Sequence, residues 1–63
     1  MEGVKLLTIF EVAELVRKTP GQLRWLRHQG KGPTSAKLGG RIVYREQDVL
    51  DWVNTAFSEQ VPA

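Results

Sequence analysis

The chain has 63 residues, of which 41% are hydrophobic and none is cysteine, so it can hold one small domain and no disulfide bond. A single histidine without thiolate ligands argues against a structural zinc site, and the sequence shows neither an apolar run of membrane-spanning length nor a signal-peptide pattern. These totals predict a protein of the cytoplasm that has no cofactor, no bound metal and no contact with a membrane.

The positive charge is concentrated in the middle of the chain. The formal net charge is only +2, yet residues 17–45 hold eight of the nine Lys and Arg residues and none of the seven acids. A local excess of this size indicates a surface that meets phosphate groups. The alternatives are a solvated basic face without a partner and a face that meets an acidic protein.

The first predicted helix begins with a capping box. Thr8 and Glu11 have the T-x-x-E spacing in which each side chain bonds the backbone of the other residue, and residues 6–8 are interpreted as the lead-in. Apolar residues then follow at helical spacing, namely Ile9, Val12, Ala13 and Val16. The pattern predicts a helix from about residue 9 to residue 16 or 17.

A second helix start follows almost at once. Thr19 and Gln22 repeat the capping-box spacing, and Pro20 stands at the first helical position, where its missing N–H costs nothing. The helix should run to about Gln29, with Gly30 as its stop. Because only two or three residues separate the two helices, the pair predicts a helix-turn-helix.

A helical wheel divides the second helix into two faces. At 100° per residue Leu23 and Leu26 face the core, and the outward positions are Gly21, Arg24, Trp25 and His28. Arg27 lies nearer the core side and is interpreted as a structural or phosphate-contacting residue. The alternatives are a half-buried Trp25 beside Leu26 and a His28 that is an ordinary surface residue.

A hairpin is predicted after a connector that lacks periodicity. Two short runs, residues 36–38 and 41–44, flank Gly39 and Gly40, which can both take the positive φ of a tight two-residue turn. A two-stranded ribbon is marginal by itself, so it must pack on the helices. We expect it to project as a basic wing.

The hairpin side chains are predicted to divide between its two faces. Leu38, Ile42 and Tyr44 are expected to face the domain, whereas Lys37 and Arg41 should lie on the other side near the tip. This arrangement would give the wing a cationic end.

The last helix is predicted from Glu46 to about Phe57. Glu46 and Asp48 fall in its first turn, where acids suit the helix dipole. Apolar residues at i, i+3, i+4 and i+7 predict its core side, with Trp52 as a core residue: Val49, Trp52, Val53 and Ala56.

The predicted fold is mostly α with a small β-hairpin. It is a winged helix-turn-helix of three helices and a two-stranded wing over residues 6–57, with flexible termini at residues 1–5 and 58–63. Catalysis is not expected, because His28 is the only histidine and its helix carries no acid. Function must therefore lie in binding.

A helix-turn-helix places its second helix in the major groove of DNA. The predicted base-reading residues are Thr19, Gly21, Gln22, Arg24, Trp25 and His28. Arg24 could contact guanine or a phosphate, and the sequence leaves both open. The predicted contacts to the DNA backbone are Arg17, Lys18 and Arg27, and those of the wing are Lys37 and Arg41.

The pattern LLT-x₃-VAELV, T-x₃-L, R-x₂-GKGP, KLGGRIVYR and DV-x₂-WV resembles the excisionase and MerR-like winged helix-turn-helix domains, which include phage excisionases and AlpA-type prophage regulators. The resemblance covers residues 6–53. It implies an architectural factor of the bacterial host cell that binds repeated sites on double-stranded DNA cooperatively, bends them and helps an integrase, of the tyrosine or serine recombinase type, to excise a prophage. It also implies recognition contacts at Gly21, Arg24, Trp25 and His28 and a wing contact at Arg41.

The chain departs from the family pattern at several positions. Arg17 and Lys18 occupy a turn that often carries glycine and a small apolar residue, which predicts added phosphate contacts. Phe10, Val43 and Leu50 are apolar where the family is commonly polar. They are interpreted as contacts to neighbouring copies or to integrase, the alternative being that they fill a small core.

Two DNA-binding functions remain open at this stage, an excisionase and a small phage or prophage transcription regulator of the same fold. MerR-type activators need a dimerisation helix, and the stretch after residue 57 is too short to supply one. This comparison favours the excisionase.

Overall fold

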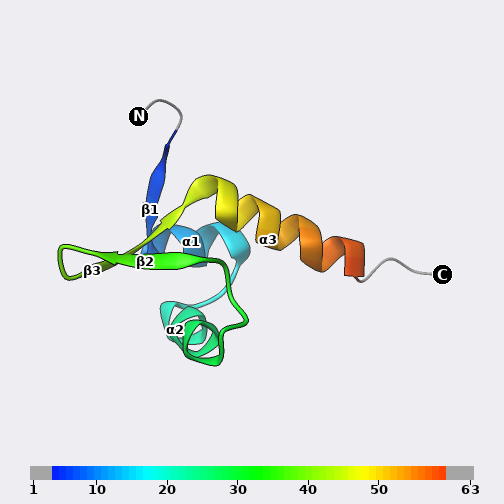
Figure 1. The fold of residues 1–63 in the computed structure, drawn as a ribbon. Helices are drawn as coiled ribbons and strands as arrows, with labels where there is room; N and C mark the ends of the chain where they lie inside the picture. The colour runs from blue at the N-terminus through cyan, green and yellow to red at the C-terminus, as the bar shows by residue number, and fades with distance from the viewer. Residues whose placement is uncertain (1–3, 60–63) are drawn as a thin grey trace.

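The computed structural model describes residues 4–59 and confirms a small winged helix-turn-helix (Figure 1). The elements follow the order β1 (Leu6–Thr8), α1 (Ile9–Val16), α2 (Pro20–Gln29), β2 (Ser35–Leu38), β3 (Arg41–Arg45) and α3 (Glu46–Glu59). The hairpin β2–β3 and the helix α3 extend in opposite directions from the centre of the molecule, with α2 to one side of both (Figure 1).

Both predicted capping boxes are present. The Thr8 hydroxyl accepts from the Glu11 N–H at 3.1 Å, and the Glu11 carboxylate accepts from the Thr8 N–H at 2.8 Å. Thr19 and Gln22 repeat the arrangement at 3.1 and 2.9 Å. Each box satisfies two N–H groups that a helix start would otherwise leave unbonded, which is why α1 and α2 begin where the sequence predicts.

The turn between α1 and α2 contains a strained residue. Arg17 ends α1 with φ 62° and ψ 40°, in the left-handed region that residues with a Cβ enter at a cost of about 1–2 kcal/mol. Its N–H and that of Lys18 bond the last carbonyls of α1, with Lys18 N lying 2.8 Å from the Ala13 oxygen. The geometry of the turn therefore suits glycine better than arginine.

We expect Arg17→Gly to raise the free energy of unfolding by about 0.5–1 kcal/mol, because relief of the left-handed strain outweighs the extra chain entropy of glycine in the unfolded state. Lys18→Gly is the matched control, because Lys18 has no positive φ and its replacement should only destabilise. Thermal and urea unfolding measure both changes, and an Arg17→Gly variant less stable than the wild type would contradict the prediction.

The strands form one antiparallel sheet in the order β1-β3-β2. The hairpin turn is as predicted, with Gly39 at φ 56° and Gly40 at φ 86°. The strand β1 was not predicted, because residues 6–8 were assigned to the lead-in of the first helix. Leu7 pairs with Tyr44 across the sheet, so the wing is anchored by a third strand as well as by the helices.

The register of the hairpin corrects the predicted faces. Leu38 pairs directly with Arg41, and Lys37 pairs with Ile42; directly opposed residues share a face. Leu38 therefore lies on the outer face, where it is 53% exposed, and Lys37 lies on the opposite face from Arg41. Ile42 is half-buried and Tyr44 is buried, as expected.

The core is small and joins α1, α2, the sheet and the start of α3. Its buried members are Leu7, Ile9, Val12, Ala13, Leu23, Tyr44 and Val49. Half-buried residues that pack against it are Val16, Leu26 and Ile42. The apolar stripes of α1 and α2 thus face inward as the helical wheel predicts.

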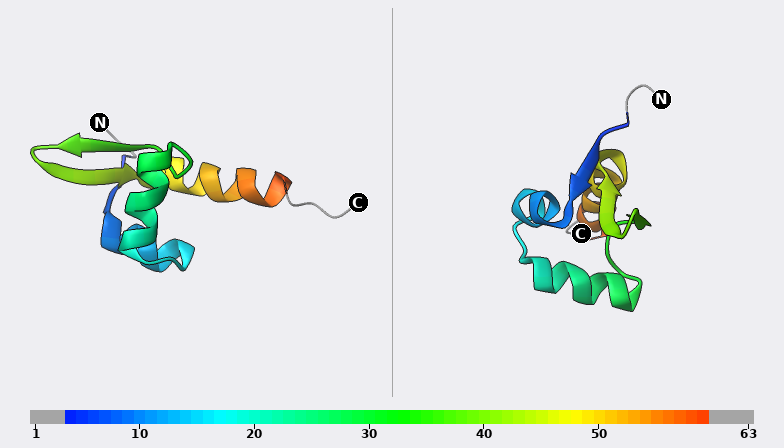
Figure 2. Two further views of the ribbon diagram at one scale, coloured as in Figure 1. Left: turned by 90° about the horizontal axis from the view of Figure 1, so that it is seen from below. Right: turned by 90° about the vertical axis from the view of Figure 1, so that its left-hand side faces the viewer.

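The predicted core stripe of α3 is correct only in its first turns. Val49 is buried, Trp52 and Val53 are half-buried, and Ala56 is exposed. The reason is the position of α3, whose C-terminal half extends beyond the other elements (Figures 1 and 2). Trp52 instead fixes the helix through a hydrogen bond, since its indole N–H lies 2.9 Å from the carbonyl oxygen of Lys31, in the loop after α2.

The ordered domain is longer than predicted at both ends. The Lys5 carbonyl accepts from the Glu46 N–H at 2.8 Å, and the two side chains lie 3.7 Å apart, so this part of the predicted flexible N-terminus is tied to α3. At the other end α3 continues to Glu59 rather than ending near Phe57. Residues 1–3 and 60–63 of the predicted flexible termini lie outside the described residues.

Candidate nucleic-acid interface

The outward face of α2 is exposed along its length. Leu23 is 1% exposed and fixes the rotation of the helix, so Arg24 and His28 point away from the core. Trp25 is 60% exposed, which excludes the alternative of a half-buried residue beside Leu26. An aromatic ring and two basic side chains therefore stand on the surface of one short helix.

A shallow hollow lies at the N-terminal half of α2. It is lined by Lys18, Thr19, Gly21, Gln22, Trp25 and Leu26. A Cβ at Gly21 would meet only the Thr19 hydroxyl, at 3.9 Å, so glycine is not required there by packing. Because Gly21 has no side chain, a binding partner can come close to the backbone of α2 at this position, beside the Trp25 ring.

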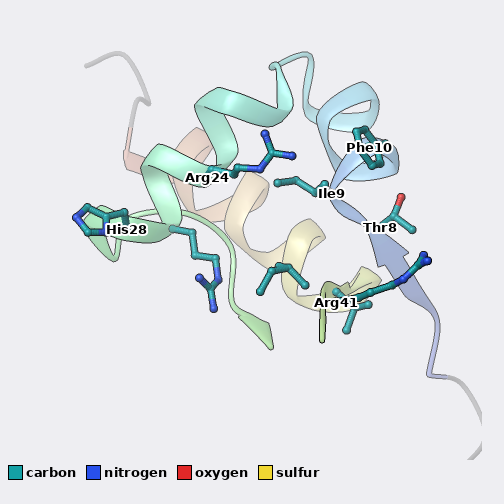
Figure 3. Close-up of a pocket in the computed structure, with 9 residues that line it drawn as sticks. Thr8, Ile9, Phe10, Arg24, His28 and Arg41 are labelled. Atoms are coloured by element: carbon teal, nitrogen blue, oxygen red, sulfur yellow. The ribbon is translucent and has the colours of Figure 1, made fainter. Parts of the chain in front are cut away.

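A deeper groove separates α2 from the wing (Figure 3). Its volume is about 690 Å³, and its basic lining residues are Arg24, Arg27 and His28 from α2 and Arg41 from β3. His28 stands at the outer end of α2, while Arg41 projects beyond the sheet on the other side of the groove (Figure 3). The predicted recognition helix and the predicted wing thus share one concave basic surface.

The cations on this surface form no ion pair with a carboxylate of the residues that the structure describes. Within residues 4–59 the ion pairs join Lys5 to Glu46 at 3.7 Å and Arg45 to Asp48 at 2.6 Å. Both pairs lie outside the groove lining. Among residues 4–59, Arg45 is the only basic residue of the stretch 17–45 that forms an ion pair, which leaves the others available to an anionic partner.

Arg27 is held in place by a contact to the sheet. Its Nε donates to the Ser35 hydroxyl at 3.0 Å, which ties the C-terminal half of α2 to the first residue of β2. This contact gives Arg27 a structural role within the fold. Because the side chain stays exposed, the remaining guanidinium N–H groups can still reach a phosphate.

Tyr44 lies beneath this basic surface with an unsatisfied hydroxyl. The residue is 1% exposed, and its OH finds no hydrogen-bond partner among the described residues. Burial raises the pKa of Tyr44 above its usual value of 10.0, while the charges of Arg27 and Arg24 act in the opposite direction. The phenol is thus neutral at physiological pH and serves as packing.

We expect Tyr44→Phe to leave the stability unchanged or raise it by up to about 1 kcal/mol, since it removes a buried hydroxyl that has no partner among residues 4–59. Because the folded pKa is raised, the stabilising contribution of the neutral phenol is complete below about pH 10 and is lost as the pH rises through the higher folded value. Thermal unfolding above pH 10 should therefore weaken the wild type more than the variant. A clearly less stable variant at neutral pH would show that the hydroxyl has a partner after all.

The remaining predicted residues are spread over the surface. Lys37 and Arg41 lie on opposite faces of the wing, and of the two only Arg41 is among the residues that line the groove. Lys18 lines the shallow hollow at the N-terminal half of α2, together with Trp25. Arg17 instead lines a hollow between α1 and α3, away from the face that carries Trp25 and the groove.

The three apolar residues assigned to protein contacts do not form one surface. Phe10 is 65% exposed and lines the basic groove. Val43 is half-buried and lines both this groove and a hollow on the outer face of the sheet. Leu50 is 40% exposed on α3 and lies outside the groove. The alternative that Phe10 fills the core is wrong.

Other exposed apolar residues were not predicted from the sequence. They are Leu6 and Leu38, on the outer face of the sheet, and Leu15 and Phe57, beside the hollow between α1 and α3. The helical phases of Leu15, outside the stripe of α1, and of Phe57, to one side of the stripe of α3, could have indicated that these two residues are exposed.

No helix in residues 4–59 is long and apolar enough to cross a membrane. The same residues contain no group of three or more His, Cys, Asp or Glu side chains arranged to hold a metal ion.

The geometry agrees with the comparison to known families. A family model described as a helix-turn-helix domain matches residues 6–56, which include both helices of the motif, the wing and most of α3. No curated protein is significantly similar to the chain. Since the match covers most of the 63 residues and the folded structure has the corresponding elements, the chain belongs to the helix-turn-helix domain family of DNA-binding proteins.

Proposed function

We propose that the protein is an excisionase, an architectural factor of the bacterial cytoplasm that binds repeated DNA sites cooperatively, bends them and promotes excision of a prophage by an integrase. The observation that carries this proposal is the groove between α2 and the wing, whose cations have no carboxylate partner within residues 4–59. The sequence patterns GKGP and KLGG, which resemble excisionases, support the finer assignment. The proposal assigns no catalytic residue to this chain.

The proposed DNA contacts follow the surface of α2 and the wing. Base edges in the major groove are read by Thr19, Gly21, Gln22, Arg24, Trp25 and His28. The backbone is held by Lys18 and Arg27, whereas Arg17, which lies between α1 and α3, is left out of the proposed contacts. The wing reaches the adjacent minor groove with Lys37 and Arg41. Two observations support these roles: the outward face of α2 is exposed, and the Lys and Arg side chains named here are exposed as well.

Cooperativity is supported by the size of the molecule. Single DNA-binding modules bury about 600–1,000 Å² of protein surface. The accessible surface of the described structure is 5097 Å², so a contact of that size already uses a large part of one face. One copy then binds modestly, and neighbouring copies raise the occupancy of repeated sites. Val43 and Leu50 are proposed to contact neighbouring copies or the integrase.

We expect the affinity for a duplex to fall with salt along a log–log slope of roughly −4 to −5, because about five phosphates would be neutralised and each contributes about −0.9. Fluorescence anisotropy of a labelled duplex over a series of KCl concentrations measures this slope. A slope near zero would contradict a phosphate-binding face.

The decisive experiment is an excision assay with attachment-site DNA and the integrase of the same prophage. We expect excision to depend on the protein, and Arg24→Ala to abolish the stimulation while leaving integration unaffected. DNA binding without any effect on excision would contradict the excisionase and leave the regulator. For a regulator, circular-permutation gel shifts would report no bend in the bound DNA. Reporter assays would show repression or activation of a promoter.

A small prophage transcription regulator is equally consistent with the helix-turn-helix family and the basic groove. The two functions use the same face of α2. The two functions differ in their effect on the bound DNA, which an excisionase bends and prepares for excision and a regulator occupies at a promoter. Bending and excision are therefore measured together.

A further inference from the structure

Phe10 occupies an unusual place for an aromatic residue. It is the second residue of α1, it is 65% exposed, and it lines the same groove as Arg24 and Arg41. Figure 3 shows its ring at the α1 side of the groove, with the Arg24 side chain directed across toward Ile9 and Phe10. The ring therefore lies within the basic surface and not on a separate apolar patch.

The core does not account for this position. The inward stripe of α1 is already supplied by Ile9, Val12 and Ala13, which are all buried. Phe10 follows Ile9 and points 100° away from it around the helix, toward solvent. An exposed ring forgoes the free energy of burial, so a partner that covers it would recover that energy.

The charge around the ring restricts what that partner can be. An apolar protein surface laid on Phe10 would also strip water from the nearby guanidinium groups without offering them a counter-charge, which is costly. A DNA strand alternates negative phosphates with deoxyribose rings, whose C–H faces are apolar. It can satisfy the cations of the groove and cover the ring at the same time.

We propose that Phe10 packs on a deoxyribose of the strand that runs through the groove between α2 and the wing, while the basic side chains of the groove hold the neighbouring phosphates. This inference rests on the proposed DNA-binding function and replaces the assignment of Phe10 to a protein contact. It adds a non-ionic contact from α1, an element to which no DNA contact had been assigned.

The test uses duplexes that carry one or two copies of a target selected by the wild-type protein from random sequences. On the single-site duplex Phe10→Ala should weaken binding by about tenfold, because one face of the ring is covered in the complex. The log–log salt slope should stay unchanged, since no charge is lost. Phe10→Leu should retain most of the affinity.

Phe57→Ala is the matched control. Phe57 is also an exposed phenylalanine, 73% accessible, but it lies at the far end of α3, outside the groove. Its replacement should leave single-site binding unchanged. Thermal unfolding should show that all three variants remain folded, as expected for exposed side chains.

The outcomes separate the possible failures. If Phe10→Ala binds the single site normally but loses cooperativity on the two-site duplex, Phe10 is a protein contact and the inference is wrong. If its deficit disappears when thymine is replaced by uracil, the ring touches a thymine methyl group and the deoxyribose assignment is wrong. If the wild type itself does not bind DNA, the proposed function fails as well.

Discussion

Replacing Arg24 and Arg41 together by alanine should weaken binding to a single-site duplex by on the order of a hundredfold, the largest loss we expect from any pair of surface changes. Each contact to a base edge or phosphate contributes roughly 1–3 kcal/mol, and the two residues lie on different elements, so their losses should be nearly additive. Both cations line the groove between α2 and the wing, and neither is paired with a carboxylate in the described part of the chain. Fluorescence anisotropy at fixed salt measures the loss.

Lys5→Ala is the control for charge. It also removes one cation, but Lys5 is paired with Glu46 and is outside the groove, so binding should change little. A double variant that binds as tightly as the Lys5→Ala protein would exclude the groove as the DNA-binding surface.

The single variant Arg24→Ala distinguishes the two roles that Arg24 can have. If Arg24 contacts guanine, the loss should be concentrated on the preferred sequence and specificity should relax at one base pair. If it contacts a phosphate, binding should weaken uniformly across sequences and the salt slope should become less steep by about one. A panel of duplexes with single base changes, measured at two salt concentrations, separates these results.

Leu23→Ala should unfold a large fraction of the protein. Leu23 is 1% exposed at the centre of the contact between α2 and the core, and such substitutions cost about 2–5 kcal/mol. A domain of this size has a total stability of only about 3–9 kcal/mol. A loss near 3 kcal/mol should lower the melting temperature by roughly 12–24 °C.

Trp25→Ala provides the comparison on the same helix. Trp25 is 60% exposed, so its loss should reduce DNA binding without a comparable fall in melting temperature. Circular dichroism during heating measures both proteins. If the Leu23→Ala variant has the same melting temperature as the wild type, the packing described between α2 and the core is wrong.

The elements that the sequence predicted well are those whose contacts close within a few residues. The capping boxes at Thr8 and Thr19 join residues three apart, and Gly39 and Gly40 turn the chain within the hairpin itself. The rotation of α2 was also predictable, because Leu23 had to be buried. The exposed face of the recognition helix followed from that rotation.

The features that were missed depend on partners far along the chain. Residues 6–8 form a strand only because β3 lies beside them, with Leu7 opposite Tyr44. Trp52 is fixed by the carbonyl of Lys31, 21 residues away, and not by full burial in the core. The position of Phe10 in the groove likewise depends on how α1 sits across from α2.

The register of the hairpin has a consequence for how the wing would contact DNA under the proposed function. Lys37 and Arg41 point from opposite faces of a thin two-stranded ribbon. If the wing inserts edge-on into the minor groove, these two faces lie against the two opposite phosphate backbones. One cation would then meet each of the two backbones. Attraction of both phosphate backbones toward the wing would narrow the minor groove. Narrowing of the minor groove on one side of a duplex would bend the DNA toward that side.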